Sequence, residues 1–426
     1  MDWGQGEFSM FPPTSLLVEG VSVTMGLLAA RDWRLLSPAI RIATQLIMAA
    51  TLYGLLLGLG VSRVGVAAVF EYVNWIAPLM ALLYVARLRP TLEQVKGWVV
   101  AFAGIAVLAG AYGWVQWLIL PPWSKFWVVS SGMGSIGQPV PIKVRFFGSF
   151  SAPGGMGRAC SLVAVLLLMF KPFKPPVLWT VTLFLAGCAL ASFVRSSWLT
   201  AMLCIIFFLL IARGKDKVRV AIAAAVVLIA LAIVAPMLPG GDRMISRFTT
   251  LSDVQGDGSF QGRMAFSGWV IGRIMEKPWG YGMGTTGAAV QRLSSQRNPI
   301  GAFDNGFLQI PYSLGIPGAV VFWIGIVKLA IALGRTRYPD TDRQLLVSVA
   351  FAVSVGHMIA LAVANFFKTD LASIFYIFLA AGLCATPSVG RTVLRGARQR
   401  VQRRYPPVDP RLGAQAMRLP REGPSG

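Results

Sequence analysis

Apolar runs of about 20 residues recur along the whole chain, and they limit what it can fold into. A helix needs roughly 20 apolar residues to cross the hydrocarbon core of a bilayer. The chain has 426 residues, of which 55% are hydrophobic and 13% charged, and its mean hydropathy is +0.65. These values are typical of polytopic membrane proteins rather than soluble domains. We predict an all-α polytopic membrane protein with about 10–12 transmembrane helices.

The apolar runs also set the predicted boundaries of the spans and of the domain. Eleven runs qualify or nearly qualify as spans. They are 14–30, 38–60, 64–86, 97–120, 154–170, 177–194, 196–212, 218–238, 307–333, 344–366 and 371–386. We predict that residues 1–386 form a single transmembrane domain, and that residues 387–426 form a basic, disordered cytoplasmic tail.

The distribution of charge predicts the orientation. The net charge of +22 would suit a nucleic-acid partner, but the basic residues gather in short loops between apolar runs and in the C-terminal tail. This is the positive-inside pattern, so we predict no nucleic-acid partner and a cytoplasmic C-terminus. Loops 121–153 and 239–306 are then external. The same alternation puts the N-terminus outside, so either 14–30 is an interfacial segment or a preceding helix is missing.

Cysteine and histidine usage argues against several kinds of active site. All four cysteines lie inside apolar runs, so we interpret them as packing residues. They are Cys160, Cys188, Cys204 and Cys384. His357 is the one histidine and also lies in an apolar run, which argues against a zinc site and against a Ser/His/Asp triad. We predict that His357 forms a hydrogen bond inside the bundle.

The long external loop 239–306 has a helical pattern of its own. Loops longer than about 12–15 residues usually have internal structure or a function. Apolar residues between Met264 and Met275 recur at roughly helical spacing, which predicts an amphipathic helix near the membrane surface. Pro278 would end this helix, and the glycines that follow permit backbone geometry that other residues resist. The alternative to a functional role is that the arginines of this interfacial helix extend towards lipid headgroups.

Three ionisable residues are the first candidates for a site. Arg195 lies at the outer end of the sixth run. An ionisable side chain is costly at membrane depth and is by default a functional candidate. The alternative is that Arg195 only marks the topology at a tight hairpin. Together with Arg263 it would suit a diphosphate, because guanidinium groups bind phosphate oxygens bidentately. Asp304 would accept a proton from a hydroxyl nucleophile, or else cap the helix that begins near Phe307.

Further charged residues fall at membrane depth. Arg158 lies one turn into a span on its outer side and would line the same cavity, and Arg145 lies in the loop before it. For Glu71 we predict a polar contact inside the bundle. For Lys328 and Arg41 we predict side chains that extend towards the membrane surface.

Four pieces of sequence occur in a fixed order between residues 145 and 325. They are RFFGSF at 145–150, RSSWL at 195–199, the stretch from Gly262-Arg263 to PWGYG at 278–282, and NGFL at 305–308 followed by LGIPG at 314–318. The ordered set resembles the O-antigen ligase and polymerase family of bacterial integral-membrane glycosyltransferases.

The resemblance implies a GT-C-like, all-helical membrane fold. Its large periplasmic loop would cover a cavity for an undecaprenyl-diphosphate-linked glycan, and the sugar would move to an acceptor hydroxyl with inversion, without a nucleotide sugar or an obligatory metal. Arg195 and Arg263 match the family's arginines, which hold the diphosphate. With them, Arg145, Arg158 and Asn305 are the expected substrate-binding residues.

One departure from the family's pattern directs the functional prediction. The histidine that precedes Asn in the ligases falls on Asp304, which looks more like the exopolysaccharide polymerase branch. We therefore expect a polymerase of undecaprenyl-diphosphate-linked repeat units, making exopolysaccharide or O-antigen at the external face of a bacterial inner membrane. The alternatives are a ligase that moves a finished glycan to a lipid or protein, and a lipid-linked glycan flippase. The expected partners are donor and acceptor glycan lipids, membrane lipids, a flippase and a chain-length regulator.

Overall fold

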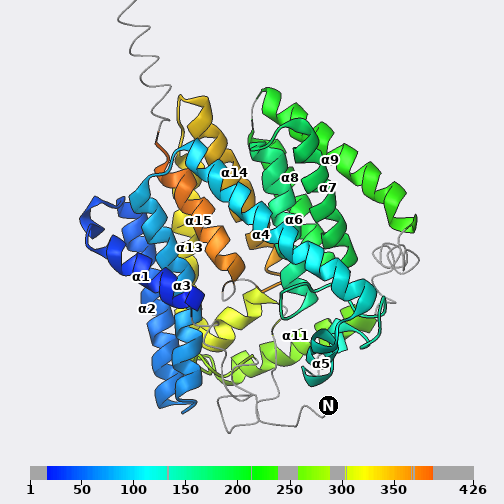
Figure 1. The fold of residues 1–426 in the computed structure, drawn as a ribbon. Coiled ribbons are helices and arrows are strands. Elements are labelled where there is room, and N and C mark those ends of the chain that lie inside the picture. The colour runs from blue at the N-terminus through cyan, green and yellow to red at the C-terminus, as the bar shows by residue number, and fades with distance from the viewer. Residues whose placement is uncertain are drawn as a thin grey trace, which may run out of the picture.

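A computed structural model of the chain is a bundle of helices (Figure 1). The structure describes residues 17–131, 134–212, 214–237, 258–287, 303, 305–365, 367 and 370–386. Within these ranges the regular elements are α-helices and short 3-10 helices, with one isolated β-bridge between Gly137 and Val144. The prediction of an all-α polytopic membrane protein is confirmed. The predicted tail 387–426 lies outside the described residues.

Eleven of the described helices correspond one to one with the eleven predicted runs. Seven are long and apolar enough to cross a membrane: α2 (Pro38–Gly60), α3 (Val66–Leu88), α4 (Leu92–Ile119), α6 (Pro153–Phe170), α9 (Lys215–Val234), α13 (Gly306–Arg335) and α14 (Thr341–Ala360). Four are shorter apolar helices: α1 (Leu17–Ala30), α7 (Pro175–Ala191), α8 (Arg195–Ile211) and α15 (Asp370–Cys384).

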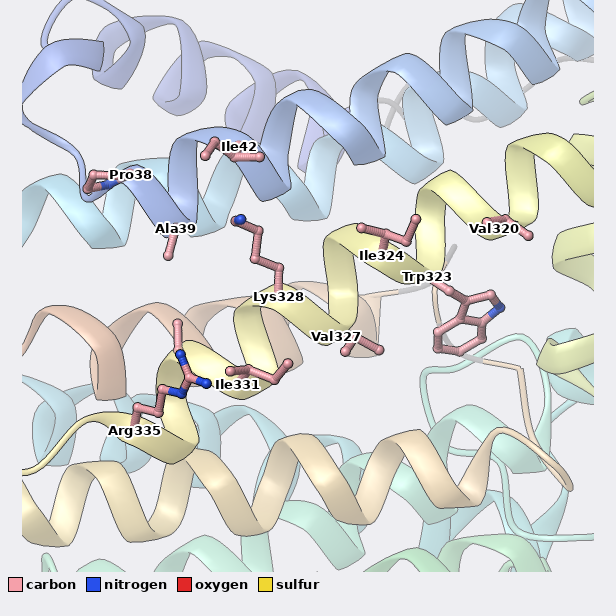
Figure 2. Close-up of a pocket in the computed structure, with 11 residues that line it drawn as sticks. Pro38, Ala39, Ile42, Val320, Trp323, Ile324, Val327, Lys328, Ile331 and Arg335 are labelled. Carbon is pink, nitrogen blue, oxygen red and sulfur yellow. The ribbon is translucent and has the colours of Figure 1, made fainter.

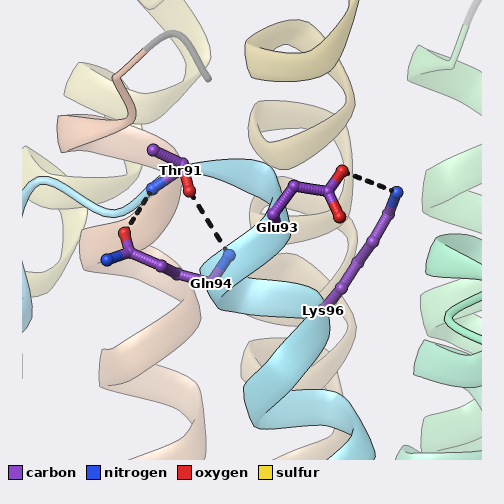
Figure 3. A network of polar contacts seen from close by, with 4 residues as sticks. All are labelled: Thr91, Glu93, Gln94 and Lys96. Atoms are coloured by element: carbon purple, nitrogen blue, oxygen red, sulfur yellow. Dashed lines mark hydrogen bonds and ion pairs between the residues drawn. The ribbon is translucent and has the colours of Figure 1, made fainter. Parts of the chain in front are cut away.

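Local sequence fixes where α4 begins. Thr91 Oγ1 accepts a hydrogen bond from the Gln94 N–H at 3.3 Å, and Gln94 Oε1 accepts one from the Thr91 N–H at 2.9 Å. This capping box satisfies two backbone donors at the helix start. The exposed Glu93 pairs with Lys96 at 3.2 Å one turn along (Figure 3). The helix therefore starts at Leu92, five residues before the predicted span.

Several loops rich in lysine and arginine meet at one end of the bundle. Three polar contacts join them: Arg87 with Asp32 at 2.5 Å, Thr386 Oγ1 with the Arg89 carbonyl at 2.7 Å, and Tyr338 Oη with the Leu383 carbonyl at 3.1 Å. The connections α1–α2, α3–α4 and α13–α14 and the end of α15 therefore lie together. This shared end is what the alternation of spans predicts.

Two helices that do not belong to the eleven predicted runs lie at the opposite end of the bundle (Figure 1). One is α11 (Gly258–Glu276), which confirms the helix predicted within loop 239–306. The other is α5 (Pro122–Ser130), in the predicted loop 121–153, which the sequence analysis had not assigned to a helix. Both follow the ends of membrane-spanning helices and cover the end of the bundle at which α6, α8 and α13 begin.

Small residues allow close helix packing within the bundle. A Cβ on Gly356 of α14 would lie 2.8 Å from Cys204 Sγ on α8, and a Cβ on Gly325 of α13 would lie 2.7 Å from Ile47 Cγ1 on α2. Lipid tails are as apolar as side chains, so close van der Waals packing is a main source of helix association in membranes. These contacts hold the frame on which the site is built.

Candidate functional site

The stretch from Pro278 to Gly287, here called the glycine segment, packs between helices although it belongs to a predicted external loop, and within it Trp279 is exposed. It follows α11, and its residues 282–286 are buried. Non-helical backbone is tolerated next to membrane-spanning helices where protein covers it. The glycine segment is therefore part of the bundle and not a surface turn.

A bend in α13 provides partners for the glycine segment. Gly315 has φ 66° and ψ 172° inside the helix, and Pro317 lacks the N–H that would bond the Ser313 carbonyl. Three hydrogen bonds use the groups freed by the bend: Tyr281 N–H to Tyr312 O at 2.9 Å, Gly282 N–H to Ser313 O at 3.1 Å, and Ile316 N–H to Pro278 O at 2.8 Å. Unpaired backbone groups are costly when buried, so the bend and the segment stabilise each other.

Glycine is required at two points of this segment. Gly282 has φ 87° and Gly284 has φ 78°, in the left-handed region where a Cβ is disfavoured. A Cβ on Gly282 would overlap the backbone of Gly58 on α2, and a Cβ on Gly284 would overlap the backbone of Ala68 on α3. The prediction that these glycines permit a geometry other residues resist is confirmed.

A buried carboxylate ties the segment to two helices. Glu71 of α3 is 4% exposed and accepts hydrogen bonds from the Gly284 N–H and from Gln309 Nε2, the latter at 3.3 Å. Gln309 Nε2 also lies 3.4 Å from Thr286 Oγ1. The network joins α3, the glycine segment and the first turn of α13. The polar contact predicted for Glu71 inside the bundle is confirmed.

An aromatic cluster fixes α11 against the bundle. Val270 and Ile274 of α11 are buried together with Phe303 and Tyr312. Tyr281 of the glycine segment stacks on Tyr312, with ring centroids 4.5 Å apart and an interplanar angle of 8°. Stacked and edge-on aromatic pairs add to the stabilisation from burial. The position of α11 therefore depends on the glycine segment.

Arg273 closes this cluster at the end of α11. Its guanidinium lies 5.7 Å from the ring centroids of both Trp269 and Tyr281, within the range of cation–π attraction. It also pairs with Glu276 at 2.8 Å, and this hydrogen bond raises the pKa of Arg273. These contacts assign Arg273 to holding the last turn of α11.

Arg195 begins α8 at a tight corner after α7. Phe193 in this corner has φ 56°, and Ser197 Oγ donates a hydrogen bond to the Val194 carbonyl at 2.6 Å. Arg195 itself is half-buried. Because the N-terminus of a helix carries partial positive charge, an arginine there adds to the attraction for an anion.

Arg158 lies beside the same corner. Gly157 packs so closely against it that a Cβ would overlap the Ser192 hydroxyl and lie 3.0 Å from Ser197 Oγ. Arg158 is half-buried on α6, one residue further along. The packing of α6 on the α7–α8 corner therefore gathers Arg158 and Arg195 in one region.

His357 of α14 lies close enough to Arg158 to interact with its charge. The imidazole is 2% exposed, and its Nδ1 lies 2.8 Å from the Val353 carbonyl one turn earlier. The predicted hydrogen bond inside the bundle is confirmed.

Arg145 lies in the loop that covers the start of α6. Its N–H donates to the Ile136 carbonyl at 2.7 Å, and further along the loop a Cβ on Gly148 would lie 3.1 Å from Met156 Sδ in the first turn of α6. Arg145 is half-buried. The loop contacts therefore bring Arg145 towards the helix that carries Arg158.

Arg263 is held differently from these three arginines. It is exposed on α11, ten residues before Arg273, and α11 packs against α13. Figure 1 shows α11 crossing the same end of the bundle. The described contacts thus group Arg145, Arg158 and Arg195 around the start of α6, and fix Arg263 through a separate helix.

Asn305 caps α13. Its Oδ1 accepts a hydrogen bond from the Phe307 N–H at 2.9 Å, and the next residue, Gly306, donates its N–H to the Leu361 carbonyl at 2.8 Å. The sequence alone allows Asp304 this capping role, whereas Asn305 holds it in the structure. Asp304 lies outside the described residues.

The comparison with protein families bears on this region. The family model described as O-antigen ligase matches residues 180–324. Residues 180–324 are therefore similar to the O-antigen ligase family. The resemblance to the O-antigen ligase and polymerase family is therefore confirmed over this stretch, which contains Arg195, Arg263 and Asn305. Arg145 and Arg158 precede the matched residues. The comparison with curated proteins gave no match.

The polar partners of Glu71 lie within the matched residues 180–324, but the sequence alone did not indicate them. Gln309 and Thr286 were not singled out, although Gln309 is the polar residue of an otherwise apolar helix start. The bend in α13 also left a signal, because Pro311 and Pro317 fall inside one apolar run and each removes a backbone donor. That pattern predicts freed carbonyls but does not identify the segment that pairs with them.

Proposed function

We propose that this chain polymerises undecaprenyl-diphosphate-linked oligosaccharide repeat units into exopolysaccharide or O-antigen at the external face of a bacterial inner membrane. The observation that carries the proposal is the position of Arg195, half-buried in the first turn of α8, beside Arg158 and inside the stretch that matches the O-antigen ligase family. Helix N-termini and guanidinium groups both attract phosphate oxygens. This corner suits the diphosphate of a lipid-linked glycan.

The reaction we propose is a single displacement. The acceptor hydroxyl oxygen forms a bond to the anomeric carbon of the donor sugar, and the bond from that carbon to the diphosphate oxygen breaks with inversion. The electron pair leaves with undecaprenyl diphosphate, and Asp304 accepts the hydroxyl proton. Arg195 and Arg263 offset the charge that develops on the leaving group. Arg145, Arg158 and Asn305 hold the donor.

The glycine segment supports this proposal by fixing α11. Tyr281 packs against Tyr312 in the cluster that buries Val270 of α11, and Arg263 lies on the same helix two turns before Val270. A preorganised cation needs no reorganisation when charge develops. The segment would thus present Arg263 at a defined place over the end of the bundle.

The proposal favours polymerase over ligase because Asp304 stands where the ligases have histidine. The two activities need different acceptors, so one assay separates them. The purified protein is incubated with undecaprenyl-diphosphate repeat units as the only glycan. A polymerase elongates them, whereas a ligase requires a separate lipid or protein acceptor.

Variants then test the proposed residues. We expect Arg195→Ala and Arg263→Ala each to reduce elongation by at least about 100-fold, the effect typical of removing one electrostatic donor. Asp304→Asn should keep donor binding and lose transfer. Arg219→Ala is the control, since Arg219 forms an exposed pair with Asp216 at the start of α9. Normal elongation by an Arg195→Ala, Arg263→Ala double variant would disprove the assignment.

A further inference from the structure

A groove between α2 and α13 lies away from the arginines of the proposed site. It has a volume of about 780 Å³ and runs along the outer face of α13 from Val320 to Arg335 (Figure 2). Its apolar walls include Ile324, Val327 and Ile331, each of which is exposed on the protein surface. These side chains lie on a membrane-spanning helix and offer an apolar surface that the described residues leave uncovered.

Two cations stand in this apolar groove. Figure 2 shows Lys328 extending from α13 towards Ala39 and Ile42 of α2, with Arg335 nearer the end of the helix. Among the described residues that line the groove, none is acidic. Throughout the described part of the chain, neither Lys328 nor Arg335 forms an ion pair with an acidic residue. Positive charge at membrane depth is costly without a counterion, so we expect an anion to bind in the groove.

The dimensions of the groove match one leaflet. Lys328 and Arg335 are seven residues apart, about 10 Å along the helix, and Val320 to Ile331 covers about 16 Å. Half of the hydrocarbon core is about 15 Å thick. The charged end of the groove lies at the end of the bundle where the lysine- and arginine-rich loops meet, and the apolar part extends towards the bilayer centre.

We propose that this groove binds one anionic glycerophospholipid of the adjoining leaflet. Its phosphate would lie between Lys328 and Arg335, and one acyl chain would follow Ile331, Val327 and Ile324. A side chain that merely extends to any headgroup would not distinguish between lipids. A groove with two cations and apolar walls prefers a headgroup with net negative charge.

The test is native mass spectrometry of the protein released from nanodiscs made of equal amounts of phosphatidylglycerol and phosphatidylcholine. We expect the wild-type protein to retain one phosphatidylglycerol preferentially. Lys328→Gln, Arg335→Gln should weaken this retention by about 30-fold, as expected for two basic residues near the membrane surface. Retention of phosphatidylcholine should stay the same.

Two further variants make the test specific. Ile324→Trp fills the groove and keeps both cations, so it should also lose the bound phosphatidylglycerol. Lys174→Gln, Lys217→Gln removes two charges at the start of α7 and α9 and should retain it. Equal retention of the two lipids by the wild type, or equal losses in the Lys174/Lys217 control and the Lys328/Arg335 variant, would overturn the proposal. A lipid-free dimer would overturn it in favour of contact between two copies of α13.

Discussion

Glu71 accepts a hydrogen bond from the N–H of Gly284, a residue 213 positions later in the chain. Glu71 lies on α3, and Gly284 lies in the glycine segment that pairs with the bend of α13. The bond therefore connects the first third of the chain to the stretch that matches the O-antigen ligase family. The family match begins at residue 180, so the matched stretch relies on a carboxylate that lies outside it.

Replacing Glu71 should loosen this connection. Glu71→Ala leaves the Gly284 N–H without its acceptor and leaves the Gln309 amide with Thr286 Oγ1 alone, and a buried donor without a partner costs about 1–3 kcal/mol. Glu71→Gln keeps an oxygen for Gly284 and should be milder. Thermal unfolding in detergent measures both. Glu93→Gln, on an exposed side chain, is the control, and equal stability of Glu71→Ala and wild type would contradict the role of the network.

Adding a methyl group to the glycine segment should destabilise the protein, whereas adding one to α11 should not. Gly282→Ala forces a Cβ into the backbone of Gly58 at a positive φ, so we expect a loss of more than about 1 kcal/mol. Gly272 is the matched control. It is helical with open space around its Cβ position, and Gly272→Ala should stabilise α11 by up to about 1 kcal/mol. Unfolding midpoints that shift in the same direction for both variants would refute this account.

Asn305 allows capping to be separated from substrate binding. Asn305→Ala removes the capping oxygen and should cost about 0.5–2 kcal/mol, whereas Asn305→Ser restores an oxygen at the same position. If Asn305 also binds the donor, as we propose, Asn305→Ser recovers the unfolding temperature but not elongation. Recovery of both would leave Asn305 as a helix cap alone.

Ionisation of Tyr338 should destabilise the folded protein at high pH. Burial raises the pKa of its phenol above the ordinary value of 10.0, and Arg343, 4.5 Å from the ring centroid, opposes this only in part. The folded state therefore favours the neutral phenol. The stabilisation that the neutral phenol gives the folded state is intact below pH 10, and it is lost as the pH rises from there through the folded pKa. Unfolding temperatures between pH 8 and pH 11 should fall more steeply for the wild type than for Tyr338→Phe. Parallel curves would rule out this contribution.

The sequence predicts the helices well because each apolar run carries its own signal. Length and hydropathy place α2 at residues 38–60 without reference to any other element. The cap of α13 shows where this fails. We expected Asp304 to cap a helix that starts near Phe307, but α13 begins at Gly306, and the residue directly before it, Asn305, is its cap.

The burial of the glycine segment could not be predicted from the sequence, for a different reason. Its glycines indicate unusual backbone geometry, but burial depends on partners in α2, α3 and α13 that lie far away in the chain. A bend at Gly315 predicts freed backbone groups, and only the tertiary structure reveals which donors reach them. The grouping of Arg158 with Arg195 is similar, since it follows from the packing of Gly157 against Ser192.

The bend of α13 has a consequence for how the protein is made. Until the glycine segment docks, Tyr312, Ser313 and Ile316 each carry a backbone group without a partner, and each such group costs several kcal/mol in lipid. The segment is synthesised just before α13, and its seat on α2 and α3 is synthesised much earlier. We therefore expect α13 to reach its final packing only together with the segment, because the segment supplies the partners of these three groups.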